Sequence, residues 1–294
     1  MSKILAYIPT FSPVVESTSN NRRPYERLKQ HEIAGRINDL GQMSREKPWV
    51  YMDCIDSVMN IRPDIDLVVA DARSTESIRE ELHKHQVACG DYSLALYPEK
   101  ESQWVVFNDV MNRHMTEETE YVVYTSSDIV WTMDWVGEAI KEFERDAALQ
   151  IVFPLVSSGD NEYLPCQVGV GPRDEPLMEA PYQEAARAPV LNGYVMIFRA
   201  EFFRVWGGYM NVYRNCFTES FLSYQCEAMG GKMRLMPRGW TYHHNGIDVW
   251  ASKDGGMYHY GAEKPVFDAM MDKLQAARIE GRMTVPFLKE LLYK

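Results

Sequence analysis

The chain has 294 residues, of which 46% are hydrophobic and 25% are charged, a composition typical of globular proteins and not of disordered ones. Its 31 basic and 42 acidic side chains give a formal net charge of −11, which argues against a broad basic face for nucleic acid or anionic lipid. The length accommodates two small domains or one large α/β domain of roughly 250 residues with extensions.

The cysteines and the amino-terminal segment bear on the compartment. The five cysteines are Cys54, Cys89, Cys166, Cys216 and Cys226. Their odd number and the absence of a CxxC pair are typical of a reduced cytoplasmic protein without a structural zinc site. We expect no secretory signal, because Pro9 interrupts the apolar run 4–8, and no stretch approaches the roughly 18 to 20 apolar residues of a membrane-spanning helix.

The first half of the chain alternates between predicted strands and helices, which indicates an α/β fold with a mainly parallel sheet. A first strand is expected at residues 4–9, followed by a Ser/Thr/Asn-rich loop at 12–23. Apolar residues at helical spacing predict helices over 25–40 and 48–60. The other elements expected up to residue 154 are strands at 66–71, 92–97, 121–125 and 150–154 and helices at 77–85, 103–115 and 135–143.

The second half is less regular. Residues 156–190 are rich in Gly, Pro and polar side chains, and we interpret them as loops able to cover a ligand. The elements expected after this region are strands at 193–198 and 233–236, a turn at 206–209, a helix at 219–229 and a helical tail from residue 265.

Three predicted strands end on a polar side chain, namely Thr10, Asp71 and Asp128. Ligands of open α/β sheets bind beyond the carboxyl ends of the strands, although turn formation is an alternative use of such residues. Asp128 follows Ser126 and Ser127 in a polar turn, where one carboxylate suits a hard divalent cation that also binds phosphate oxygens and water.

Two later features add candidate chemistry. The pair His243-His244 offers an imidazole ligand for the same ion, with a structural role as the alternative. Glu219 lies at a predicted helix start and is a candidate general base, although the helix dipole alone also favours Glu there. No GxGxxG, GxxxxGK[ST] or GxSxG motif is present, and the histidines lack the HExxH spacing, which argues against dinucleotide-binding, P-loop, hydrolase and metalloprotease classes.

In their order along the chain, these residues resemble the GT-A fold glycosyltransferases of family 2. The resemblance rests on residues 7–10, 68–74, 192–193, 207–209, 218–220, 230–235 and 243–244, together with Asn108 and Asp128. It implies an α/β GT-A fold with a mainly parallel central sheet flanked by helices. It also implies one domain over residues 1–260, with 12–63 as a helical insertion and 156–190 as a loop region, and a C-terminal helical extension over 261–294.

The resemblance implies transfer of a sugar from a nucleotide-diphosphate donor, with a UDP-sugar favoured, and a requirement for Mn²⁺ or Mg²⁺. It assigns Asp128 and His243 or His244 to the metal, and Glu219 to the base that deprotonates the acceptor hydroxyl in an inverting reaction. The residues it places at the nucleotide sugar are Pro9, Thr10, Asp71, Arg73, Asn108, Ser127 and Gly193.

Departures from the family pattern keep alternatives open. The DxD motif is reduced to Ser126-Ser127-Asp128, and Ser220 follows Glu219 where the family has Asp. A retaining reaction and a non-catalytic nucleotide-sugar- or glycan-binding protein therefore stay open, as does an oligomer assembled through the insertion. Basic residues at 22–36 and in the tail, at 278–294, suggest a further acceptor, DNA with a hydroxylated base, although a solvated helix face explains them as well.

Overall fold

The computed structural model describes residues 3–10, 50–72, 74, 76–97, 103–157, 179–180, 195–208, 221–243 and 256–293. The strands in these ranges are β1 (Lys3–Thr10), β2 (Asp66–Ala72), β3 (Tyr92–Tyr97), β4 (Thr119–Thr125), β5 (Ile129–Trp131), β6 (Leu149–Ser157), β7 (Glu179–Ala180), β8 (Val195–Arg199) and β9 (Lys232–His243). The helices are α3 (Val50–Ile61), α4 (Glu76–Cys89), α5 (Gln103–His114), α6 (Trp135–Arg145), α7 (Ala200–Trp206), α8 (Leu222–Ala228), α10 (Gly256–Ile279) and α11 (Val285–Leu292).

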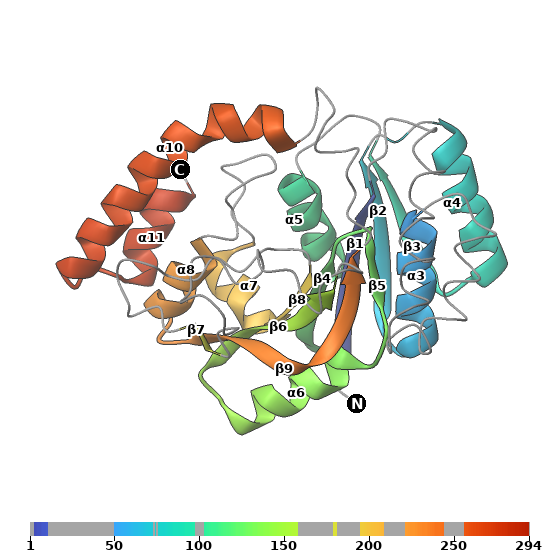
Figure 1. Cartoon of the computed structure of the whole chain (residues 1–294), viewed down its shortest axis with the longest axis horizontal. Helices are drawn as coiled ribbons and strands as arrows, with labels where there is room; N and C mark the ends of the chain where they lie inside the picture. The colour runs from blue at the N-terminus through green and yellow to red at the C-terminus, as the bar shows by residue number, and fades with distance from the viewer. Residues whose placement is uncertain are drawn as a thin grey trace.

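The described strands form one sheet in the order β3-β2-β1-β4-β8-β6-β9-β5, and β7 pairs with β9 (Figure 1). Strands β3, β2, β1 and β4 are parallel to one another, and β6 is parallel to β9. Strand β8 is antiparallel to both β4 and β6, and β5 and β7 are antiparallel to β9. The predicted α/β fold with helices around a central sheet is confirmed.

Helices cover both faces of the sheet, so its central strands are buried on both sides. In β1, Leu5 and Tyr7 face a core shared with α5, α7, α8 and the tail helices. The alternate residues Ile4, Ala6 and Ile8 face a second core shared with α3, α4 and α6. This two-sided burial explains why the strand reads as a continuous apolar run in the sequence.

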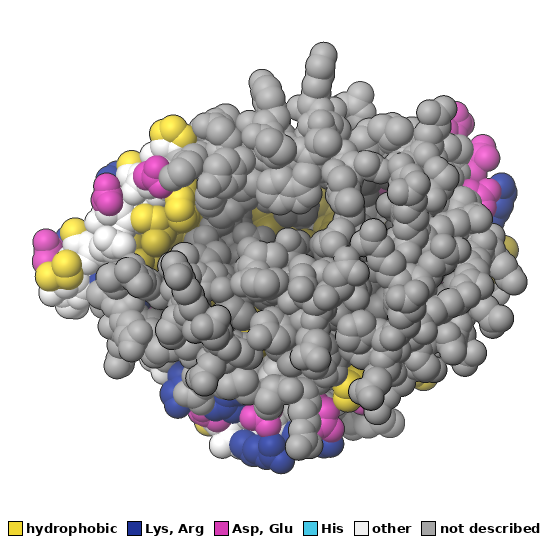
Figure 2. Space-filling model, in the orientation of Figure 1, with side chains coloured by type: hydrophobic (Ala, Val, Ile, Leu, Met, Phe, Trp, Pro, Cys, Tyr) yellow, Lys and Arg dark blue, Asp and Glu magenta, His cyan; other side chains and the backbone are white. Residues whose placement is uncertain are grey.

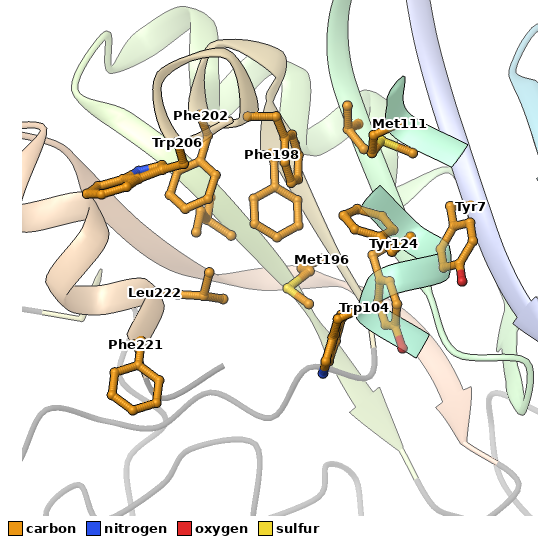
Figure 3. Packing of buried hydrophobic residues seen from close by; sticks show 14 of the residues in the cluster. Tyr7, Trp104, Met111, Tyr124, Met196, Phe198, Phe202, Trp206, Phe221 and Leu222 are labelled. Carbon is orange, nitrogen blue, oxygen red and sulfur yellow. The ribbon is translucent and has the colours of Figure 1, made fainter. Parts of the chain in front are cut away.

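The first core is built largely from aromatic rings, as Figure 3 shows. Tyr7 meets Phe107 edge to face, with ring centroids 4.9 Å apart, and Trp104 lies 5.5 Å from Tyr124. Such pairs contribute about 0.5 to 1.5 kcal/mol beyond the apolar area they bury. These contacts fix α5 against the strands whose ends carry the candidate site.

The molecular surface over α6 carries both signs of charge, which lie side by side at the lower rim of Figure 2. Lys141 and Arg145 pair along α6 with Glu138 and Glu142, each at 2.6 Å. Exposed pairs of this kind contribute little to stability, about 0 to 1 kcal/mol each. None of the described helices is long and apolar enough to cross a membrane.

Several predicted elements are confirmed and others need correction. Strands β2 and β3 and helices α3 and α5 lie where the periodicity predicts them, but β5 and α7 were not predicted. Strand β9 is longer than the predicted 233–236, because its register with β6 shifts between Phe153 and Leu155 and so accommodates Pro237 in an irregularity. Helix α10 begins at Gly256 and contains Pro265, which was predicted to open it. The predicted helix 25–40 lies outside the described residues.

The tail is attached to α7 and α8 through Tyr293. Its hydroxyl donates to the Gly208 carbonyl at 3.2 Å and accepts from Gln225 Nε2 at 2.9 Å. Its ring stacks on Trp206, with the planes 9° apart. The carboxyl-terminal helices are therefore part of the same packed unit as the sheet.

Gly208 provides a test of this region. Its φ is +123°, and an added Cβ would lie 2.8 Å from Asn108 Oδ1. We expect Gly208→Ala to lower the free energy of unfolding by about 2 kcal/mol or more, through strain and collision. Gly90→Ala is the matched control, because Gly90 has φ +74° with open space around it and should lose only about 1 kcal/mol. Equal losses in urea denaturation would contradict the close approach to Asn108.

Candidate functional site

The carboxyl ends of β1 and β2 bring two of the predicted site residues into contact. Thr10 is the register partner of Asp71 in the parallel ladder. The Thr10 hydroxyl donates to Asp71 Oδ1 at 3.2 Å, and both residues are buried. The polar side chains that end the first two strands therefore lie in contact at one edge of the sheet.

The second oxygen of Asp71 is held by two donors. Arg79 Nε, on α4, donates to Asp71 Oδ2 at 2.8 Å, and the Ser74 backbone N–H donates to it at 3.1 Å. Arg79 Nη2 also donates to the Tyr97 carbonyl at 2.8 Å, at the end of β3. A fully buried carboxylate is therefore neutralised by a partly exposed guanidinium that also joins the ends of β2 and β3.

Arg79 belongs to the candidate site but was not predicted from the sequence. The predicted arginine was Arg73, six positions nearer the amino terminus, which lies outside the described residues. The sequence does contain a signal for Arg79. A strand that ends in Asp is followed by a helix with a cation in its first turns. Its side chain can reach back to the strand end, as it does to Asp71 here.

The turn that carries Asp128 connects β4 to β5 and is held from behind by α3. Cys54 Sγ donates to the Ser126 carbonyl at 3.4 Å. Ser57 Oγ accepts from the Trp131 N–H at 3.0 Å and donates to the Cys54 carbonyl at 2.7 Å. Helix α3 therefore bonds to the chain before and after Asp128, at Ser126 and at Trp131. Asp128 itself is half-buried.

Electrostatics also place Asp128 close to Cys54. Burial raises the pKa of the Cys54 thiol, and the negative charge of Asp128 raises this pKa further. The thiol consequently stays protonated and keeps its hydrogen for the Ser126 carbonyl. The Asp128 carboxylate and the two serines before it offer hard oxygen ligands, which fit Mn²⁺ or Mg²⁺. The Cys54 thiol beside them is a neutral hydrogen-bond donor.

Strand β9 brings one predicted metal ligand toward this turn. The β5–β9 ladder pairs Ile129 with His243, so the His243 backbone lies opposite the residue that follows Asp128. A carboxylate and an imidazole on adjoining strands are a suitable ligand pair for Mn²⁺. His244 lies outside the described residues.

Strand β4, which leads into the Asp128 turn, is a direct neighbour of β1. Tyr7 of β1 pairs with Tyr124 of β4, and Thr10 and Ser127 each lie three residues beyond this pair. Since β2, β1 and β4 are adjacent and parallel, Asp71, Thr10 and the Asp128 turn follow the same edge of the sheet. The order of the strands therefore groups residues that are widely separated in the sequence.

The remaining predicted site residues are distributed as follows. Pro9 lies in β1 opposite Ala70, and Ser127 is half-buried in the Asp128 turn. Asn108 lies on α5, with its side-chain oxygen against Gly208. The predicted residues that lie outside the described ranges are Arg73, Gly193, Glu219 and His244.

Comparisons with known proteins identify the architecture. No protein-family model and no curated protein matches the sequence. Among solved structures, mannosyltransferase PcManGT from Pyrobaculum calidifontis aligns with 84% of this chain and 59% of its own, at 16% identity and a TM-score of 0.55. GalNAc-T7 aligns with 82% of this chain and 43% of its own, at 16% identity and the same TM-score of 0.55. The chain therefore has a GT-A fold.

A third GT-A neighbour, S. aureus TarS 1–349 in complex with UDP, aligns with 82% of this chain and 60% of its own, at 12% identity and a TM-score of 0.50. The chain thus spans between 43% and 60% of the length of these three neighbours. At these identities the likeness concerns the GT-A fold, and the chemistry has to be argued from this chain's own residues.

The Asp71–Arg79 pair gives the first prediction at this edge. Arg79→Leu leaves a fully buried carboxylate without its cation, and we expect it to lower the free energy of unfolding by about 3 kcal/mol or more. The double variant Arg79→Leu/Asp71→Asn should lose much less free energy of unfolding than the two single variants lose together. The difference corresponds to a coupling of about 1 to 3 kcal/mol. Arg113→Leu, which breaks a more exposed pair with Asp109, should cost about 1 kcal/mol or less. Additive losses in denaturation experiments would rule out the coupling.

The contacts that α3 makes with the segment around Asp128 give a second prediction at this edge. Ser57→Ala removes the side-chain acceptor of the buried Trp131 N–H, which we expect to cost about 1 to 3 kcal/mol. Amide exchange at Trp131 should accelerate accordingly. Ser93→Ala, at an exposed position of β3, is the control and should change neither quantity. Unchanged exchange at Trp131 in the Ser57 variant would show that α3 does not hold this segment.

Proposed function

We propose that the chain is a cytoplasmic, metal-dependent glycosyltransferase that moves a sugar from a nucleotide-diphosphate donor to an acceptor hydroxyl, with a UDP-sugar as donor. The observation that carries this proposal is the grouping of the Thr10–Asp71 contact and the Asp128 turn along one carboxyl edge of a GT-A sheet. The PcManGT structure contains GDP-Man and Mn²⁺, and the GalNAc-T7 structure contains UDP, GalNAc and Mn²⁺, which supports the donor class and the metal.

The nucleoside end of the donor is assigned to the β1–β2 edge. Pro9, Thr10, Asp71 and Arg73 would line the base and ribose. The contacts of Asp71 with Thr10 and Arg79 fix the carboxylate before any ligand arrives. Preorganised polar groups lose little conformational entropy on binding, so this pair suits a recognition role.

The diphosphate end is assigned to the Asp128 turn. Asp128, with His243 or His244, would hold Mn²⁺ or Mg²⁺, and Ser127, Asn108 and Gly193 would contact the nucleotide sugar. When bound, the divalent ion supplies positive charge that offsets the negative charge developing on the leaving diphosphate. The Cys54 and Ser57 contacts keep the Asp128 turn in place during this charge change.

Glu219 is assigned the role of general base, taking the proton from the acceptor hydroxyl as that oxygen attacks the anomeric carbon. Attack from the face opposite the leaving diphosphate inverts the anomeric configuration. A correctly placed base of this kind contributes about 100-fold to 10,000-fold in rate.

The tail bears on the alternative of a DNA acceptor. Arg278 is almost fully buried in a pair with Glu227, and Arg282 pairs with Glu280. Carboxylates already engage these two cations, which weakens the contribution of the tail to a polyanion site. The basic residues at 22–36 lie outside the described residues.

Two substitutions test the proposal. The full chain with Mn²⁺ should bind one member of a panel of UDP- and GDP-sugars and hydrolyse it slowly. Glu219→Gln should lower turnover by about 100-fold to 10,000-fold with donor binding retained. Asp128→Asn should weaken metal-dependent donor binding. Glu201→Gln, at an exposed site on α7, is the control and should behave as the wild type.

Three results would change the conclusion. A chain that binds no donor in the panel would remove the proposed function. A donor that binds but is turned over neither by itself nor with any acceptor would favour the non-catalytic nucleotide-sugar-binding protein. Full turnover in Glu219→Gln would eliminate this residue as the base and leave a retaining reaction open.

A further inference from the structure

A second group of metal-ligating side chains lies away from the candidate site, between α3, α4 and the start of β3. Asp56 comes from α3, and His85 and Cys89 come from α4 at a spacing that puts both on one face of the helix. A carboxylate oxygen, an imidazole nitrogen and the thiol sulfur all lie within 4.8 Å of one another. Asp56 and His85 are buried, and Cys89 is half-buried.

The cluster lies between α3 and α4, near the start of β3. Cys89 is the last residue of α4, and β3 begins at Tyr92, which contacts His85. The residues of the candidate site instead follow the carboxyl ends of β1, β2 and β4. The two sites share α3, because Asp56 is adjacent in sequence to Ser57, which accepts a hydrogen bond from Trp131.

Hydrogen bonds orient the His85 ring. Nδ1 lies 3.1 Å from the Tyr92 hydroxyl, which also lies 3.0 Å from the Leu82 carbonyl. Nε2 lies 2.8 Å from Asp56 Oδ1 and 3.6 Å from Cys89 Sγ. In the tautomer in which Nδ1–H donates to the Tyr92 hydroxyl, Nε2 presents its lone pair toward Asp56 and Cys89.

A metal ion that accepts the Nε2 lone pair together with Asp56 and Cys89 would satisfy this tautomer, whereas an Nε2–H that donates to Asp56 would satisfy the other tautomer without an ion. Carboxylate, imidazole and thiolate are all ligands of Zn²⁺, and bonds of about 2.0 to 2.3 Å place tetrahedral ligands roughly 3.3 to 3.8 Å apart. The Cys89–His85 separation of 3.6 Å lies in this range, and the Asp56–His85 separation of 2.8 Å needs only a small side-chain movement. Tyr92 and Leu82 form the outer hydrogen bonds that usually orient a ligating histidine.

We propose that Asp56, His85 and Cys89 bind a zinc-class divalent cation, with water in the fourth position beside the half-buried Cys89. Binding releases the thiol proton to solvent and leaves a thiolate–metal bond. The cation joins α3 to α4, and α3 is the helix that holds the Asp128 turn through Cys54 and Ser57. The cysteine pattern did not predict a zinc site, because one Cys, one His and one Asp from two helices produce no CxxC signal.

Cobalt provides the direct test, because a cobalt–thiolate bond absorbs in the near ultraviolet. The full chain with Co²⁺ should show this band at one ion per chain, and Zn²⁺ should abolish it. Cys89→Ser should lose the band, whereas Cys226→Ser, whose thiol is buried in the other core, should keep it. Asp128→Asn should also keep it, which separates this site from the proposed glycosyltransferase metal.

Protection of the thiol is an independent readout that needs no variant. Zn²⁺ should slow alkylation of Cys89 by iodoacetamide at least tenfold. Cys54 and Cys226 serve as internal controls, because burial raises their pKa and keeps them slow with or without Zn²⁺. Equal labelling of Cys89 with and without Zn²⁺, or a cobalt band unchanged in Cys89→Ser, would overturn the proposal and leave a hydrogen-bonded pair of His85 and Asp56 in its place.

Discussion

The coverage of both faces of the sheet by helices is the constraint on which the candidate site depends. Side chains of β1 from Ile4 to Ile8 point alternately into two apolar cores, so this part of the strand carries no exposed polar group. Polar chemistry is confined to the strand ends, where the chain leaves the cores. In a parallel sheet those ends share one edge, so Thr10 and Asp71 meet although 61 residues separate them.

The helices that cover the sheet also position the groups at its edge. Helix α4 supplies Arg79, which neutralises the buried Asp71, and α3 supplies Cys54 and Ser57, which bond to both sides of the Asp128 turn. The same two helices also carry the three ligands of the proposed cation site, Asp56, His85 and Cys89. Burial of apolar surface and orientation of polar groups are thus performed by different faces of single helices, and a change on one face is felt on the other.

How much is predictable from the sequence depends on the range of the interactions. Strand β2 and its terminal Asp71 were predictable, because an apolar run buried on both faces ends in a polar turn. Helix α7 was missed because it follows β8 without an intervening turn residue, and β9 was predicted too short because Pro237 resembles a strand breaker. Arg79 left a local signal, a cation early in the helix that follows a strand-ending Asp. The partners of His85 could not be predicted, because they depend on how two helices lie beside one sheet and leave no local pattern.

The attachment of Tyr293 to Gly208 and Gln225 has a consequence for biosynthesis. A ribosome delivers the chain from its amino terminus, so the β1–β4 block emerges long before its partners near the other end. Trp206 stays without its stacking ring until residue 293 has left the exit tunnel. The aromatic core around α7 consequently closes only after residue 293 has been synthesised, and the apolar surface of Trp206 stays exposed until then.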